Sequence, residues 1–200
     1  MDPKVNDRFD LWLNKMYGSY GTVKCTRGKV HDYLGMTFDY SVPNTVKVDM
    51  CDYVAAMIDN FPVHLTKDDV APTPAEADLF AQPQSEVLPK ANAEIFHTFV
   101  AKGLFLCKRA RPDIQTAISA LCTRVKEPTQ DDWRKLLRLM RYLNATRGDV
   151  LTLSADDLRV IKWYVDVGFA IHPDFKFHTG GDLAFGRGCT LSLSCKHRLN

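Results

Sequence analysis

The sequence has 200 residues, of which 46% are hydrophobic and 25% charged, with 26 Lys and Arg against 24 Asp and Glu. This is enough apolar material for one core or two small ones, and no apolar run approaches the ~18 residues that a membrane-spanning helix requires. The net charge of +2 hides an asymmetry: residues 49–99 hold nine acidic and two basic residues, whereas residues 102–147 hold eleven basic and four acidic. This distribution, unlike the totals, points to contact with nucleic acid.

Six cysteines are spread along the chain without a Cys-x-x-Cys pair or a regular spacing. The pattern is typical of free thiols in a reducing compartment, and the polar start MDPKVNDRFD is not a secretory signal. We therefore expect an intracellular protein, cytoplasmic or nuclear, that has no membrane partner. The spacing of Cys189, Cys195 and His197 fits no recognised zinc pattern.

The first 65 residues combine two predicted helices with three predicted strands. Apolar residues recur at helical spacing in residues 5–17 and again in residues 49–62, where Pro62 ends the pattern. Between them, Gly and β-branched residues predict a meander with turns near Gly28 and near Pro43-Asn44. Residues 66–90 are rich in proline and acids and lack a period, so they are predicted to be an extended connector on the surface.

The second half changes from a helical to a strand pattern. Residues 92–110, 112–128 and 129–149 each read as an amphipathic helix of three to four turns. In the last of these, Thr129 or Asp131 supplies a cap and Gly148 ends the helix. Alternation with a period of two then predicts short strands in residues 150–155, 160–171, 180–188 and 189–196.

One of these strands carries a carboxylate at its centre. In KWYVDVGFAIHPDFKFHTGG (162–181), Asp166 shares a face with Tyr164 and Gly168. An ionised group at mid-strand is costly unless it is paired or holds a metal, and metal chemistry on phosphates needs carboxylates on rigid strands. The competing interpretation is an edge strand whose aspartate faces water.

Several segments resemble copia-type LTR retrotransposon Pol polyproteins, in the family's order along the chain. KWYVDVGFAIHPDFKFHTGG followed by GRGCTLSLSCKHRLN (186–200) is similar to the start of the ribonuclease H domain. GKVHDYLGMTFDY (28–40) is similar to the strand pair after the polymerase active site, which grips the primer. ARPDIQTAISALCTRVKEPTQDDWRKLLRLMRYLNATRG (110–148) resembles the helical thumb and connection.

The resemblance implies a parent enzyme that makes DNA on an RNA template and degrades the RNA strand, using paired Mg²⁺ ions. Asp166 would be the first ribonuclease H carboxylate and a Mg²⁺ ligand. The sequence has no Tyr-x-Asp-Asp turn, and we expect the remaining carboxylates to lie beyond Asn200, so this chain is predicted to bind no Mg²⁺ stably and to be inactive. The family's second strand is apolar, whereas this one contains Asp182.

Two groups of residues are candidates for nucleic-acid contact. Tyr33, Leu34 and Gly35 lie at the primer-grip-like turn, where the alternative is a plain strand with a bulge glycine. The second group shares one helix face and could follow a phosphate backbone, or could equally be a solvated face; it comprises Arg134, Lys135, Arg138 and Arg141. The positive region is extended by Lys102, Lys108, Arg109 and Arg111, although for Arg111 we favour an ion pair with Asp113.

We therefore predict an α+β chain with antiparallel strands, a helical thumb and connection bundle, and an incomplete ribonuclease H-like sheet. The predicted division is a palm edge (1–65), a connector (66–90), the helical part (91–149) and the ribonuclease H strands (150–200). The expected partners are an RNA–DNA or DNA duplex, bound weakly, and the remainder of the polyprotein, with self-association through an open sheet edge. The alternatives are a non-enzymatic remnant, an interaction module that uses the helices, or a small nuclease built around Asp166.

Overall fold

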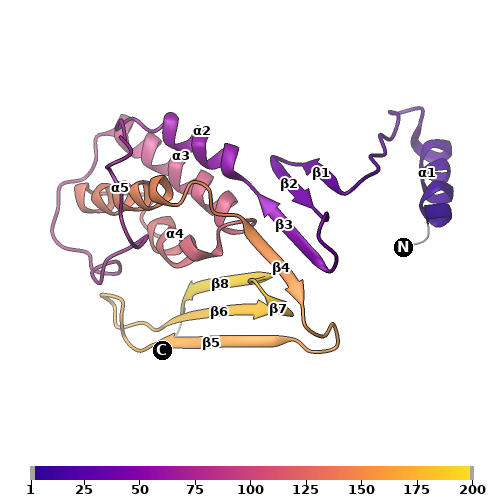
Figure 1. The fold of residues 1–200 in the computed structure, drawn as a ribbon. Helices are drawn as coiled ribbons and strands as arrows, with labels where there is room; N and C mark the ends of the chain where they lie inside the picture. The colour runs from indigo at the N-terminus through magenta and orange to yellow at the C-terminus, as the bar shows by residue number, and fades with distance from the viewer. Residues whose placement is uncertain (1–2, 199–200) are drawn as a thin grey trace.

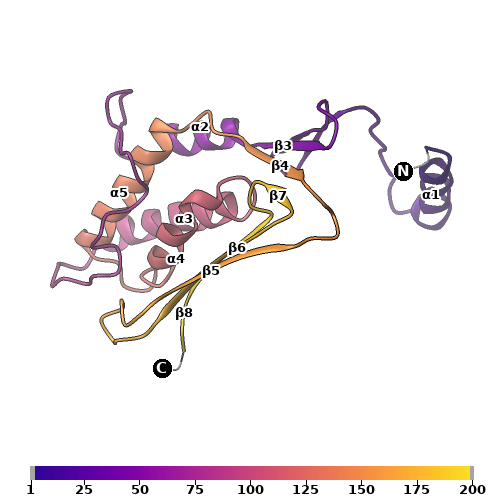
Figure 2. The same cartoon turned by 60° about the horizontal axis from the view of Figure 1, so that its bottom comes forward.

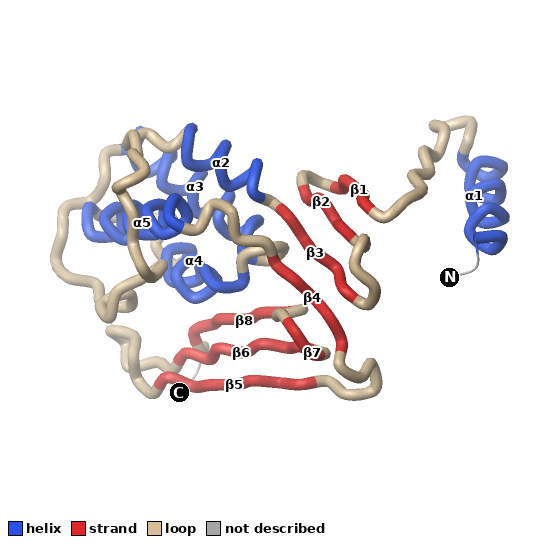
Figure 3. The backbone as a smooth tube through the Cα atoms, viewed as in Figure 1, coloured by secondary structure: helices blue, strands red, loops and turns tan. Residues whose placement is uncertain are grey.

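The computed structural model describes residues 3–198 and has an α+β fold, as predicted (Figure 1). Most helices gather in one part of the molecule, and the strands form two antiparallel sheets (Figure 3). The helices are α1 (Pro3–Tyr17), α2 (Cys51–Asp59), α3 (Lys90–Cys107), α4 (Gln115–Cys122) and α5 (Gln130–Ala145), with a 3₁₀ turn η1 (Pro112–Ile114) before α4. The strands are β1 (Val30–Tyr33), β2 (Met36–Asp39), β3 (Thr45–Asp49), β4 (Leu151–Ala155), β5 (Lys162–Gly168), β6 (His178–Ala184), β7 (Gly186–Arg187) and β8 (Leu191–Lys196).

The hydrophobic core lies among helices α2 to α5 and one face of the larger sheet. Helices α3 and α4 approach closely because residue 103 is glycine: a Cβ there would lie 2.3 Å from Ile118 Cδ1. Each fully buried aliphatic side chain stabilises the fold by about 1.5–3 kcal/mol relative to exposure. The fully buried side chains of this core include Phe96, Leu106, Ile114, Ile118, Leu136, Leu139, Met140 and Leu143.

The larger sheet has the strand order β1-β2-β3-β4-β7, with antiparallel neighbours throughout. Strands β3 and β4 meet with Val46 opposite Leu153 and Val48 opposite Leu151, so their apolar residues face the helical core together. Strand β4 lies after the predicted boundary at residue 150 yet pairs with a strand from the first 65 residues. The two predicted parts therefore share one sheet, and the division into four segments remains a prediction.

The smaller sheet has the order β5-β6-β8, which leaves β5 as an edge strand. Its inner face packs toward α4, where the Ser192 hydroxyl of β8 donates to Gln115 Oε1 at 3.3 Å. The opposite face turns away from the helices (Figure 2). That outer face exposes large apolar side chains: Trp163, Val165, Val167 and Leu191 are 49–64% exposed.

Helix α1 lies apart from the rest of the chain, at the right of Figure 1, and buries no residue. The segment after it folds back, since Arg27 pairs with Asp7 at 2.7 Å and Asp10 at 2.8 Å. None of the described helices is both long and apolar enough to cross a membrane.

Three local predictions were wrong. Helix α5 ends at Ala145, with Thr146 as its C-cap, and not at Gly148, because the Thr146 hydroxyl bonds back to the Tyr142 carbonyl at 2.8 Å. The first strand pair reverses at Leu34-Gly35 and not near Gly28, because both turn residues take positive φ (51° and 74°), the twist that suits a two-residue hairpin. Helix α4 ends at Cys122, well short of the predicted residue 128. The Thr123 hydroxyl bonds back to the Ala120 carbonyl at 2.7 Å and competes with helix continuation.

Candidate nucleic-acid interface

The hairpin of β1 and β2 presents the predicted primer-grip-like residues at its tip. Tyr33 pairs with Met36, and Leu34 and Gly35 form the turn between them. Met36 is 8% exposed and anchors the hairpin in the core, whereas Tyr33 and Leu34 are 63% and 62% exposed. An anchored base with an apolar, solvent-facing tip can place a ring and an aliphatic side chain against a base or a sugar.

The basic helix α5 is stabilised at its start by a capping box. The Thr129 hydroxyl accepts from the Asp132 N–H, and the Asp132 carboxylate accepts from the Thr129 N–H at 2.8 Å. This confirms Thr129 as the cap and places the acidic residues at the positive end of the helix. One face of α5 enters the core, with Leu136, Met140 and Leu143 fully buried, so the arginines lie on the other faces.

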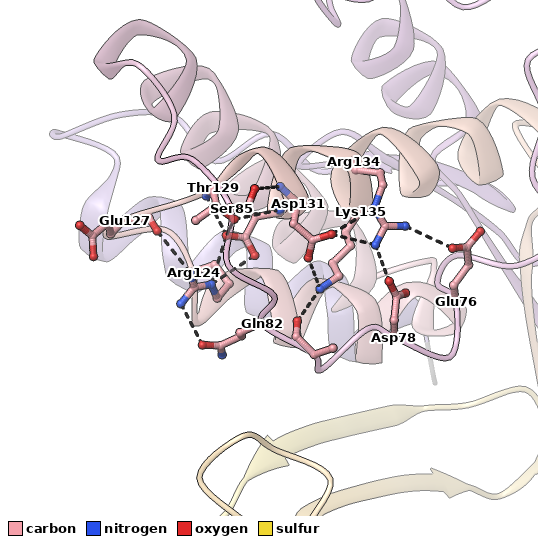
Figure 4. Close-up of polar contacts among 12 residues, drawn as sticks. Glu76, Asp78, Gln82, Ser85, Arg124, Glu127, Thr129, Asp131, Arg134 and Lys135 are labelled. Carbon is pink, nitrogen blue, oxygen red and sulfur yellow. Dashed lines mark hydrogen bonds and ion pairs between the residues drawn. The ribbon is translucent and has the colours of Figure 1, made fainter.

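The arginines of α5 are paired with the connector. Arg134 contacts Glu76 at 3.2 Å and also Asp78 (Figure 4). Arg138 contacts the same Glu76 carboxylate. Farther along the helix, Arg141 lies 3.7 Å from Asp69. The predicted extended connector therefore runs along α5 with its carboxylates directed at the guanidinium groups, and these arginines do not form a bare phosphate-facing surface.

Lys135 has a different environment from the arginines. It is 7% exposed, and its ammonium group pairs with Asp131 at 2.7 Å and donates to the Ala81 carbonyl at 2.6 Å. Burial pushes the pKa of Asp131 up, but hydrogen bonds from Lys135 and Arg134 outweigh it, so the pKa is lowered. The hydrogen bond to Asp131 raises the pKa of Arg134. Lys135 thus holds the connector in place.

The other basic residues of the predicted positive region are engaged within the protein. Lys102 lies over the Phe99 ring at 5.0 Å and Arg109 over the Phe105 ring at 3.6 Å. Lys108 donates to the Ser192 carbonyl at 2.9 Å and so ties α3 to the smaller sheet.

Arg111 has the structural role that the sequence favoured. It is 2% exposed and donates to Asp113 at 2.7–3.2 Å and to the Thr146 carbonyl and hydroxyl at 3.0 and 2.6 Å. The Tyr142 hydroxyl donates to the same Asp113 carboxylate at 2.9 Å. The segments around Pro112 and around Tyr142, both within the resembling residues 110–148, are therefore in direct contact.

Asp166 lies on the edge strand β5 and faces solvent, as the competing interpretation of this strand expected. Its carboxylate accepts from the Val167 N–H at 2.9 Å. Asp166 and Asp182 both line a hollow of about 300 Å³ between the smaller sheet and the start of α4. The Asp182 carboxylate also accepts a hydrogen bond from the Cys189 thiol at 3.2 Å. Burial raises the pKa of Cys189 to about 11, so the thiol keeps its proton.

This donor set does not fit a pair of Mg²⁺ ions. Hard divalent cations take several converging oxygen ligands, and a two-ion site needs ligands for both ions about 4 Å apart. Within residues 3–198, no group of three or more His, Cys, Asp or Glu side chains is arranged to hold a metal. Asp166 and Asp182 supply two carboxylates between them.

Sequence reasoning missed the partners of the arginines. The signal was present in the charge asymmetry, since an acidic connector precedes a basic helix, but spacing alone did not indicate which carboxylate meets which guanidinium. A buried histidine pair was also missed: His172 Nε2 lies 3.0 Å from His178 Nδ1, and His178 Nε2 lies 2.6 Å from Ser194 Oγ. The Phe80 ring of the connector lies 4.8 Å from both imidazoles.

Comparison with known proteins gives one informative similarity. The chain is 24% identical over 194 residues to the transposon Ty5-1 protein YCL074W of Saccharomyces cerevisiae, which covers 97% of this chain and 60% of the yeast protein. The chain thus spans less than two thirds of this relative's length. No family model matches the sequence, and no solved structure matches it. The similarity supports a retrotransposon-derived chain.

Proposed function

We propose that this chain is a non-catalytic, duplex-binding part of a copia-type reverse transcriptase and ribonuclease H polyprotein. In this proposal residues 1–65 are the palm edge with the primer-gripping hairpin, residues 91–149 are the thumb and connection, and residues 150–200 begin the ribonuclease H sheet. The parent protein would copy RNA into DNA and degrade the RNA strand with Mg²⁺. The remainder of the polyprotein would be a partner, inside the cell.

The exposed hairpin tip is the observation that carries the proposal. Tyr33 and Leu34 stand at a tight turn on a hairpin that Met36 fixes to the core. The Thr37 hydroxyl donates to Asp32 at 2.6 Å across the two strands and stiffens the tip further. A rigid apolar tip loses little conformational entropy on contact with a base or sugar, so it suits a duplex whose phosphates make the other contacts.

Filter binding with an RNA–DNA hybrid tests this proposal. Replacing both Tyr33→Ala and Leu34→Ala should weaken binding about tenfold, since stacking on one aromatic side chain contributes about 1–3 kcal/mol. The matched control is Tyr20→Ala with Leu158→Ala, which removes the same side-chain types at positions 90% and 79% exposed. Equal affinity of the hairpin variant and this control would contradict the proposal.

The absence of catalysis is proposed from the donor set around Asp166. Two carboxylates in one hollow cannot hold two ions, so the hybrid's RNA strand should survive incubation with Mg²⁺. Mg²⁺-dependent cutting by this chain that Asp166→Asn abolishes would support the nuclease alternative instead.

A second candidate function is binding to another protein chain. The smaller sheet is a better candidate for the contact surface than the helical bundle. On the outer face of the edge strand β5, the side chains of Trp163, Val165 and Val167 are 49–64% exposed. Unpaired strand edges with apolar faces promote strand addition by another chain. Light scattering should then show self-association that Val165→Lys reduces, and a monomer at all concentrations would count against it.

A further inference from the structure

The ion pairs between the connector and α5 form one continuous interface. We define the acidic segment as residues 69–78 and the arginine face as Arg134, Arg138 and Arg141. Three carboxylates of the acidic segment meet the three guanidinium groups, and the Thr73 hydroxyl accepts from Arg138 at 2.9 Å. The three carboxylates are those of Asp69, Glu76 and Asp78. The interface therefore neutralises the charge of the arginine face almost completely.

The geometry of the arginine face suits a nucleic-acid backbone. Its arginines span seven residues of helix, about 10 Å at 1.5 Å per residue. Phosphates of one strand follow one another at about 3.4 Å along the duplex axis, so the face covers about three of them. Guanidinium groups bind phosphate oxygens through their N–H donors. Here Arg134 donates to single carboxylate oxygens of Glu76 and Asp78, and Arg138 donates to a single oxygen of Glu76.

The acidic segment is held firmly at its ends and electrostatically around Glu76 and Asp78. At one end, Asn144 Nδ2 donates to the Thr66 and Asp69 carbonyls at 2.8 and 2.9 Å. At the other end, Lys135 donates to the Ala81 carbonyl at 2.6 Å. Between these anchors, Ala71 is 4% exposed and Ala75 packs against the core, whereas Glu76 and Asp78 contact α5 through exposed ion pairs. The part around Glu76 and Asp78 can therefore leave the arginine face while the rest of the segment stays attached.

The ion pairs themselves are weak and incompletely matched. The side chains of Arg134, Glu76 and Asp78 are 44–47% exposed, and exposed pairs contribute only about 0–1 kcal/mol each. Among the described residues, Arg138 Nε, Arg141 Nε and Asp78 Oδ1 are buried without a hydrogen-bond partner. A duplex has a higher charge density than three carboxylates and offers acceptors to those two nitrogens.

We propose that the acidic segment is an intramolecular competitor that covers a duplex-binding surface on α5. The segment occupies the arginine face in the free protein, and a nucleic-acid duplex displaces the part around Glu76 and Asp78 to reach Arg134 and Arg138. This inference rests on the proposed function for the identity of the ligand, but it concerns a surface separate from the hairpin tip.

The test compares the affinity of full-length variants for an RNA–DNA hybrid at about 50 and 200 mM salt. Glu76→Gln with Asp78→Asn removes the connector carboxylates that pair with Arg134 and Arg138, although Arg134 keeps its bond to Asp131 at 2.9 Å, and should tighten binding about tenfold at low salt. Two freed arginines should also steepen the dependence of log K on log salt by about 1.8, at about 0.9 per phosphate contact. Adding Arg134→Gln and Arg138→Gln to that variant should abolish both gains.

The matched control is Asp68→Asn with Glu86→Gln, which changes the net charge by the same amount. Both residues are exposed, and neither forms a side-chain ion pair within the described part of the chain. This control should change affinity by about twofold or less. Equal gains in the control and the test variant, or no gain in either, would overturn the inference.

Further measurements separate this inference from misfolding and from the hairpin proposal. Circular dichroism and a urea midpoint report whether the double variant is folded. If the double variant is unfolded, the single variant Glu76→Gln is measured instead, because Glu76 pairs with both Arg134 and Arg138. Its affinity for the hybrid should rise about threefold. If the hairpin variant binds normally while the Glu76→Gln with Asp78→Asn variant gains affinity, the hairpin proposal fails and the covered surface stands.

Discussion

Replacing Arg111 by methionine should destabilise the fold by about 3 kcal/mol. The change keeps most of the side-chain volume but removes all hydrogen bonds that Arg111 donates to Asp113 and Thr146. The bonds from this charged donor to the Thr146 carbonyl and hydroxyl contribute about 1.5–3 kcal/mol, although the carbonyl keeps a bond from the Asp149 N–H at 3.1 Å. The Asp113 side chain is 36% exposed and keeps its bond from Tyr142, so solvent recovers part of the lost ion pair and about 1 kcal/mol remains.

Guanidinium chloride denaturation measures this difference directly, and heating should show a fall in Tm of about 6–12 °C for a chain of this size. Arg159→Met is the control, because Arg159 is 90% exposed and pairs only with Asp157 nearby in the sequence. An unfolding free energy of Arg111→Met within about 0.5 kcal/mol of the unmodified protein would refute the structural role of Arg111.

Three further predictions concern the core, the cap and the histidine pair. Leu143→Ala should cost about 3–5 kcal/mol in urea denaturation, because Leu143 is fully buried in the core, and a cost under about 1 kcal/mol would contradict that packing. Thr129→Ala should cost about 1 kcal/mol by the same measurement, whereas Thr129→Ser should cost little because it keeps the capping hydroxyl; equal losses would exclude the cap. Burial lowers the pKa of His172 and of His178, so the unfolded chain binds more protons near pH 6.5 and stability should fall as the pH drops below that value. Denaturation at pH 5 and pH 8 should show this loss, and replacing His172 by Gln and His178 by Asn should reduce it; an unchanged pH dependence would contradict the buried pair.

Local features were predictable from the sequence because neighbouring residues determine them. The capping box at Thr129 involves residues three apart, and the contact of Arg111 with Asp113 involves residues two apart. The amphipathic helix predicted in residues 129–149 does bury one face, with Leu136, Met140 and Leu143 at helical spacing.

Non-local features were not predictable in the same way. Strand β4 pairs with β3 across about 100 residues of sequence, and nothing in either strand names its partner. The arginine face had the right spacing for phosphates, but its partners lie about 60 residues earlier along the chain. The apolar residues of the strand containing Asp166 are typical of a buried strand, yet an edge position in a three-stranded sheet leaves them exposed.

We propose that this retrotransposon-derived chain holds a nucleic-acid duplex without cutting it. Incubation of the full chain with an end-labelled RNA–DNA hybrid and Mg²⁺, followed by filter retention and a denaturing gel of the retained hybrid, measures both properties on one sample. We predict that the hybrid is retained with its RNA strand intact, and that retention falls as salt increases. A hybrid that passes through the filter at low salt, or an RNA strand cut only when Asp166 is present, would contradict the account.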